Sequence, residues 1–315
     1  MIVLDTTRPV VDAARLVRID DTAILRWAAG VRPDDLRPRG HALLAEIPGN
    51  RSGLANLVLL IDSLNFCFWG EPPPSMDWNG RRYAGFNALL AAVILAAQQD
   101  TRWSDPRFWA AMTREDFRAA LAPAGNLSLL DERERVLRET GQTLCKMFAG
   151  GFAEAADSVN RRAWDLAALL TAGFGSFRDV SAHGGRAVWF VKRAQIAALD
   201  LSTTWSIHGH EPLEGLERLT AFADYRLPQA LRHLGILQYA PPLAAAVDAL
   251  EELPAGGEAE VEIRAATVWA VERMRVAAAA RGIDATAWEI DWHLWDRAHA
   301  PDVTRPHHRT RTIYY

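Results

Sequence analysis

The sequence predicts a mostly α-helical protein, folded as one compact domain over residues 1–315. Two observations support this prediction, the first for helices and the second for a single domain. Apolar side chains recur at intervals of three and four residues along most of the chain, and runs of strict alternation are few. The helical segments also follow one another without a clear linker. We therefore expect a single domain, with a two-lobed arrangement around a cleft as the alternative.

Helical patterns in the first half of the chain lie at 6–17, 20–31, 56–69, 79–99, 104–112, 113–121, 129–148 and 157–174. Pro9 sits just after two threonines, which is the usual place for proline in a first helical turn. Thr113 and Asp116 form a variant of the capping box. The proline-rich stretch at 71–80 is expected to be a loop.

Helical patterns in the second half lie at 186–201, 227–238, 241–252, 258–280 and 285–297. The four residues VWFV at 188–191 would also suit a strand. They run on into KRAQIAALDL, so we expect a helix there.

Composition and charge exclude several classes of protein. The net charge is −4, and the only dense basic run is 305–311, whereas a protein that grips nucleic acid usually has a wider basic face. The longest apolar run, 88–97, is half a membrane span, and the N-terminus lacks a signal-peptide pattern. The sequence contains no phosphate-binding loop, no serine nucleophile motif and no metal-binding pattern. We expect a cytoplasmic monomer without metal, cofactor, membrane or stable nucleic-acid partner; a small phosphorylated ligand remains compatible.

The stretch IDSLNFCFWG at 61–70 carries a carboxylate, a hydroxyl and an amide inside an apolar run. Buried polar groups cost a few kcal/mol unless they are paired, so these groups are either satisfied by neighbours or face a ligand. Helical spacing would place four of its side chains on one face, namely Asp62, Asn65, Phe66 and Trp69. That spacing predicts one wall of a pocket.

Lys192 and Asp224 are the two charged residues with the most informative surroundings. On a helix, Lys192 would share a largely apolar face with Trp189 and Ile196; such a lysine either extends to solvent or meets an anion in a cavity. Asp224 lies in a turn before a helix that Pro228 opens. Its ordinary role would be to cap that helix, and its functional role would be a carboxylate at the mouth of a pocket.

Two later segments place acids beside tryptophans. Glu262 shares a helix face with Trp269, and a salt bridge is its simplest explanation. Asp291 and Trp295 are one helical turn apart. Twelve tryptophans and these acids suit a planar heterocycle joined to a polar, anionic part.

Several segments, in order along the chain, resemble the queuosine salvage proteins, which are queuosine 5′-phosphate N-glycosylases. The resemblance is carried by DSLNFCFW at 62–69, ERVLRETGQTL at 134–144, FGSFRD at 174–179, VWFVKRAQIAALDL at 188–201, FADYRLPQALRHLGIL at 222–237, EVEIRAATVWAVE at 260–272 and HHRTRTIYY at 307–315. It implies hydrolysis of the N-glycosidic bond of queuosine 5′-monophosphate, which releases the 7-deazaguanine base queuine and ribose 5-phosphate. It also implies a helical fold similar to that of helix-hairpin-helix DNA glycosylases.

The resemblance implies a role for each candidate residue. Asp224 would be the catalytic carboxylate that stabilises positive charge on the sugar, and Lys192 would hold the sugar or phosphate or, alternatively, attack the sugar as an amine. The substrate-binding candidates are Asp62, Asn65, Phe66, Trp69, Tyr225, Asp291 and Trp295 for the base, and Arg193, His308, Arg309 and Tyr315 for the phosphate. A base-excision glycosylase acting on DNA or tRNA and a non-enzymatic helical adaptor are the alternatives.

Overall fold

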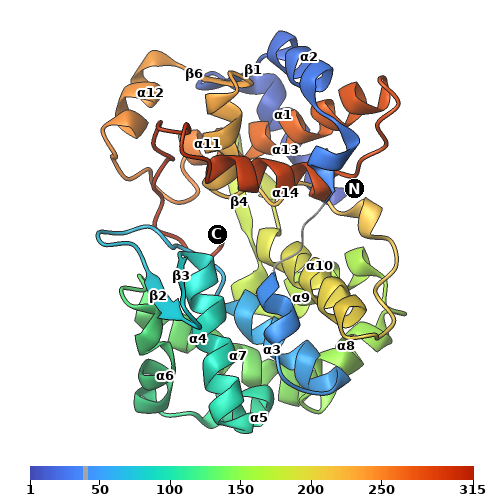
Figure 1. Ribbon diagram of the computed structural model, residues 1–315. Coiled ribbons are helices and arrows are strands. Elements are labelled where there is room, and N and C mark those ends of the chain that lie inside the picture. The colour runs from blue at the N-terminus through green and yellow to red at the C-terminus, as the bar shows by residue number, and fades with distance from the viewer. Residues whose placement is uncertain (38–41) are drawn as a thin grey trace.

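Helices make up most of the computed structural model, which describes residues 1–37 and 42–315 (Figure 1). The mostly helical class predicted from the sequence is therefore confirmed. One group of helices, in the lower half of Figure 1, contains α3 (Arg51–Ser63), α4 (Phe86–Gln99), α5 (Pro106–Ala111), α6 (Arg114–Leu121), α7 (Leu130–Phe148), α8 (Phe152–Ser158), α9 (Ala163–Gly173) and α10 (Lys192–Ile207). The other group contains α1 (Ile2–Ala13), α2 (Asp21–Gly30), α11 (Arg226–His233), α12 (Pro241–Asp248), α13 (Glu258–Ala279) and α14 (Ala287–Ala298).

Strands form three small antiparallel pairs among the described residues. The pairs are β1 (Val17–Ile19) with β6 (Leu237–Tyr239), β2 (Ser75–Trp78) with β3 (Arg81–Ala84), and β4 (Val180–His183) with β5 (Arg186–Trp189). The first pair joins segments far apart in sequence, with Val17 opposite Tyr239. The two others are local hairpins.

Each helical group has its own apolar core. The buried faces of α3, α4, α7, α9 and α10 form the larger core, and α2, α11, α13 and α14 form the second. The chain end lies between the two groups (Figure 1). Among the described residues, no helix combines the length and the apolar character that a membrane crossing requires.

Capping side chains fix several helix starts. The predicted capping box at the start of α6 is confirmed: the Asp116 amide donates to Thr113 Oγ1, and the Thr113 amide donates to the Asp116 carboxylate. Thr286 and Glu289 make the same arrangement at α14. Asp20 caps α2, which ends at Gly30, within the helical pattern expected over 20–31.

The expected start of the first helix is wrong. Helix α1 begins at Ile2, so Pro9 lies inside it rather than in its first turn. Proline removes one backbone hydrogen bond, but Val3, Thr7 and Val10 on the same helix are buried. Packing of this face therefore outweighs the missing bond.

Two expected helices begin as hairpins. Residues 79–99 contain strand β3 before α4, because Asn79 and Gly80 both have positive φ, which suits a two-residue turn and pairs β2 with β3. The same pairing places a strand within 71–80, where a loop was expected. Residues 186–201 likewise begin with β5, which follows a Gly184–Gly185 turn with positive φ at both residues. The helix expected over 186–191 is therefore wrong.

The helix expected over 227–238 is shorter than predicted. Helix α11 ends at His233, and Gly235 has a φ of +73° before strand β6. The bounds of the later helices α12, α13 and α14 all lie within four residues of the predicted ones, and α12 and α13 begin at the predicted residue.

Candidate active site

A cavity opens where the two helical groups meet. Its walls come from five parts of the chain: the segment after α3, the β2–β3 hairpin with the start of α4, α10, the segment leading into α11, and α14 with the chain end. The lining residues that carry polar or aromatic groups are Asn65, Phe68, Phe86, Lys192, Asp200, Phe222, Asp224, Tyr225, Arg226, Asp291, Trp292, Trp295, His299 and Tyr315. No single sequence segment would build this site alone.

Asp224 lines this cavity and lies two residues before the first residue of α11, Arg226. Its Oδ1 accepts hydrogen bonds from the backbone amides of Arg226 at 2.7 Å and Leu227 at 3.0 Å. The side chain is thus fixed by the capping contact that such an aspartate usually makes. Asp224 therefore binds the first two amides of the helix and also lines the cavity.

Lys192 is the first residue of α10, so the helix face expected to include Trp189 does not exist. The side chain is buried and lines the cavity. Burial lowers the pKa of Lys192, and the nearby carboxylates of Asp224 and Asp62 oppose that shift. Of the two positions considered for Lys192, the side chain lies in the cavity and does not extend to solvent.

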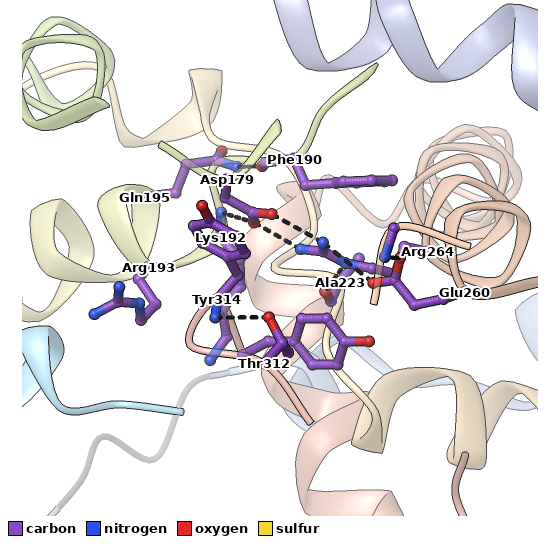
Figure 2. Close-up of polar contacts among 12 residues, drawn as sticks. Asp179, Phe190, Lys192, Arg193, Gln195, Ala223, Glu260, Arg264, Thr312 and Tyr314 are labelled. Atoms are coloured by element: carbon purple, nitrogen blue, oxygen red, sulfur yellow. Dashed lines mark hydrogen bonds and ion pairs between the residues drawn. The ribbon is translucent and has the colours of Figure 1, made fainter. Parts of the chain in front are cut away.

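A buried ion pair links the backbone of Lys192 to that of Ala223, the residue before Asp224 (Figure 2). Arg264 donates to Asp179 through two contacts of 2.6 and 2.9 Å, and its Nε donates to the Ala223 carbonyl at 3.0 Å. Asp179 in turn accepts the Lys192 amide at 3.1 Å. The pair therefore fixes the positions of Ala223 and Lys192 relative to each other.

Three further carboxyls surround this centre. Burial raises the pKa of Asp62 to about 7, with opposing contributions from Asn65 and Lys192. Burial and then the negative charge of Asp62 raise the pKa of Asp200 well above its usual range. Burial also raises the pKa of Asp291, although the Phe222 amide donates to its carboxylate at 2.7 Å. A raised pKa favours the protonated form of a carboxyl, which can both donate and accept a hydrogen bond.

The raised pKa of Asp62 predicts a pH-dependent stability. The folded protein keeps this proton at pH values where the unfolded chain, with a pKa near 3.8, has released it. The stabilisation is present in full below about pH 4 and is lost as pH rises through about 7. Relative to Asp62→Asn, we expect the wild type to lose on the order of 3 kcal/mol of unfolding free energy between pH 4 and pH 8. Urea unfolding of both proteins at both pH values measures the unfolding free energy. If the difference between wild type and Asp62→Asn did not change with pH, the pKa of Asp62 would not be raised.

The stretch at 61–70 does not form one helix face, so that prediction is wrong. Helix α3 ends at Ser63, and Asn65 reaches the cavity from irregular backbone. Asp62 lies behind it and accepts the Asn65 side-chain amide at 3.1 Å. Phe66 and Trp69 belong to a separate buried cluster.

Two buried arginines explain why the backbone can leave the helix there. Arg133 donates to the carbonyls of Leu64, Phe66 and Cys67. Arg193 donates to the carbonyl of Ser63 in the same way. These guanidinium groups satisfy carbonyls that a longer helix would have paired.

Three of the residues proposed for phosphate binding do not line the cavity. The Arg193 guanidinium is bound to backbone carbonyls. Burial, with the neighbouring His307, lowers the pKa of His308 to about 3, so its ring is neutral. Arg309 contacts the Glu71 carboxylate at 3.3 Å. Tyr315, the fourth, does line the cavity.

Sequence reasoning missed several lining residues. Asp200 follows Lys192 by two helical turns, with Ile196 and Leu199 between them on the same face, and this spacing was a usable signal. His299 packs against Trp295, with ring centroids 4.3 Å apart and the ring planes tilted by 50°.

The salt bridge expected for Glu262 is not found among the described residues. Its carboxylate instead accepts the backbone amides of Arg15, Leu16 and Val17. The carboxylate lies within 4.8 Å of donor atoms of His183 and Glu258, but its own oxygens are already engaged by these amides.

An aromatic cavity with a few convergent polar and titratable groups is the usual form of an enzyme site for a small ligand. The family model for queuosine salvage proteins matches residues 48–315. A Sphaerobacter thermophilus protein named queuosine 5′-phosphate N-glycosylase/hydrolase is 44% identical over 99% of this chain and 97% of its own length. Proteins of the same name from Bos taurus and Mus musculus are 33% and 37% identical, over 99% and 82% of this chain and 98% and 81% of their own lengths. The chain belongs to the queuosine salvage protein family.

Proposed function

We propose that this protein hydrolyses the N-glycosidic bond of queuosine 5′-monophosphate and releases queuine for reuse in tRNA modification. The observation that carries the proposal is the placement of Asp224 and Lys192 in one cavity with aromatic walls. The relatives from Sphaerobacter thermophilus and Bos taurus, which are named for this activity, match 99% of the chain.

Asp224 is the proposed catalytic carboxylate. Cleavage of the bond between the anomeric carbon and the base nitrogen builds positive charge on the sugar, which a carboxylate stabilises. Two backbone amides occupy Oδ1, so Oδ2 is left for the sugar and the attacking water. Water adds to the anomeric carbon and gives up a proton, and the departing base nitrogen gains one.

The base is proposed to lie among Asn65, Asp291 and the rings of Tyr225, Trp295 and Tyr315, all of which line the cavity. Burial raises the pKa of Asp291 and of Asp200, which favours the protonated carboxyl; that form offers both a donor and an acceptor to the polar edge of a purine-like base. Asp62, Phe66 and Arg193 would act indirectly, by supporting the segment that carries Asn65.

Lys192 is proposed to stabilise the reacting sugar by its charge and hydrogen bonds. The sequence contains two lysines, and the other, Lys146, is exposed on α7. We expect Lys192→Met to lower kcat about 100-fold, because removing one well-placed donor typically has that effect. Lys146→Met is the matched control and should leave kcat unchanged. Borohydride treatment during turnover separates the mechanisms: a reduced sugar adduct on Lys192 would contradict direct hydrolysis.

The test of the function is direct. Purified protein incubated with queuosine 5′-monophosphate should release free queuine and ribose 5-phosphate, separated by liquid chromatography. A folded sample that releases no queuine would refute the proposal.

Two alternatives have observable consequences. A base-excision glycosylase would bind DNA or tRNA with an affinity that falls steeply with salt. An adaptor without activity would pair its polar groups within 62–65 and leave no cavity. Asn65 and Asp62 do pair, yet Asn65 also lines the cavity with Asp224 and Lys192, which favours the enzyme.

We also propose that the helical framework is related to helix-hairpin-helix DNA glycosylases. We propose further that the chain acts as a single-domain cytoplasmic monomer without a stable nucleic-acid partner. Superposition on such glycosylases tests the first proposal. Light scattering and a single cooperative unfolding transition test the monomer and the single domain.

A further inference from the structure

Arg226 is a cation in the cavity that the proposed hydrolysis does not use. Among the described residues that line the cavity, the lysine and arginine side chains are Lys192 and Arg226. Lys192 is surrounded by the carboxyls of Asp224, Asp62 and Asp291. Arg226 forms no ion pair with a described carboxylate; its guanidinium donates to the neutral Gln229 Oε1 at 3.0 Å. Its positive charge is therefore available to a ligand.

The position of Arg226 relative to Asp224 suits one part of the substrate. Both residues lie in one turn, and the Arg226 amide donates to Asp224 Oδ1 at 2.7 Å. Asp224 is buried whereas Arg226 is half-buried, and both line the cavity. In a nucleoside 5′-monophosphate, only the ribose separates the anomeric carbon from the 5′-phosphate. A group that meets the anomeric carbon and a group that meets the phosphate must therefore be close neighbours.

His299 does not compete for this role. Its Nδ1 lies 2.8 Å from the Trp295 carbonyl and must donate to it, which leaves Nε2 as an acceptor in the neutral ring. Burial and the Arg226 charge lower the pKa of His299, so the ring is neutral near pH 7. A neutral acceptor suits a substrate hydroxyl rather than a phosphate dianion.

We propose that Arg226 binds the 5′-phosphate and makes the enzyme prefer the nucleotide over the nucleoside. This inference rests on the proposed function. A guanidinium presents paired donors that match phosphate oxygens, and its charge is retained at any physiological pH. A partly solvated position also keeps low the cost of desolvating the phosphate dianion.

The experiment compares Arg226→Gln and Arg226→Lys with wild type on two substrates, queuosine 5′-monophosphate and queuosine. The ratio of kcat/KM for nucleotide over nucleoside should fall about 10–100-fold in Arg226→Gln, mostly through KM for the nucleotide, and less in Arg226→Lys. Arg311→Gln is the matched control, because Arg311 pairs with Glu252 and does not line the cavity. A ratio in Arg226→Gln within about twofold of wild type would overturn the proposal.

Binding of ribose 5-phosphate, measured by calorimetry, separates this inference from the function. Wild type should bind it, and Arg226→Gln should bind it at least about 10-fold more weakly. If wild type releases no queuine from either substrate but shows this dependence, the proposed function fails and the phosphate site stands. If binding is absent, or equal in both proteins, the phosphate site is wrong. Thermal melts of the variants exclude loss of folding as the cause.

Discussion

Replacement of Asp224 by asparagine should lower kcat for queuine release about 1000-fold and leave the thermal midpoint within about 2 °C of wild type. The amide removes the negative charge that stabilises the sugar in the transition state. Its oxygen can still accept from the amides of Arg226 and Leu227, and asparagine caps helices about as well as aspartate. Steady-state kinetics and a thermal melt on the same sample measure both effects.

Two other variants sharpen this result. Asp284 is exposed and lies outside the cavity, so Asp284→Asn is the charge-matched control and should retain full turnover. Asp224→Ala removes the cap as well and should lose about 1 kcal/mol of unfolding free energy besides its activity. If Asp224→Asn kept more than a tenth of wild-type turnover, the carboxylate mechanism would be wrong even if queuine release were observed.

Replacement of Arg264 by methionine should lower the unfolding free energy by about 3–5 kcal/mol. The methionine occupies much of the same space but leaves the carboxylates of Asp179 and Glu260 buried without their cation, at 2.6 and 3.5 Å from the lost nitrogens. The carbonyl of Ala223 also loses its donor. Denaturant unfolding followed by tryptophan fluorescence measures the change.

A surface ion pair provides the comparison for Arg264. Arg273 and Asp21 approach to 2.9 Å, with side chains 33% and 68% exposed. Such pairs contribute about 0–1 kcal/mol, so Arg273→Met should have a small effect. Equal losses in the two variants would show that the buried pair is not what stabilises this region. Because Asp179 also accepts the Lys192 amide, Arg264→Met should reduce kcat in samples kept below their melting temperature.

The local signals in the sequence were reliable where local contacts decide the structure. The capping box at Thr113 and Asp116 and the end of α2 at Gly30 are set by groups within a few residues of each other. Asp224 is a similar case, because its amide contacts lie two and three residues along the chain. Hairpins were missed at Asn79–Gly80 and Gly184–Gly185, although glycine at these turns was a usable local signal.

The stretch at 61–70 shows where sequence periodicity fails. Helical spacing was correct through Ser63, but the next residues leave the helix because Arg133 and Arg193 bind their carbonyls. Those arginines are about 70 and 130 residues away in sequence. No pattern within the stretch could reveal that contact.

The sequence by itself determined the helical class, several helix ends, the order of the family segments, and Asp224 and Lys192 as the charged residues to examine. Periodicity and capping depend on residues three or four positions apart, so the local sequence indicates them directly. Only the tertiary structure decided which side chains share the cavity. It brought in Asp200 and His299 and separated Phe66, Trp69 and Arg309 from them. The reason is physical: the cavity is built from five distant parts of the chain, and the packing that aligns them depends on all their side chains at once.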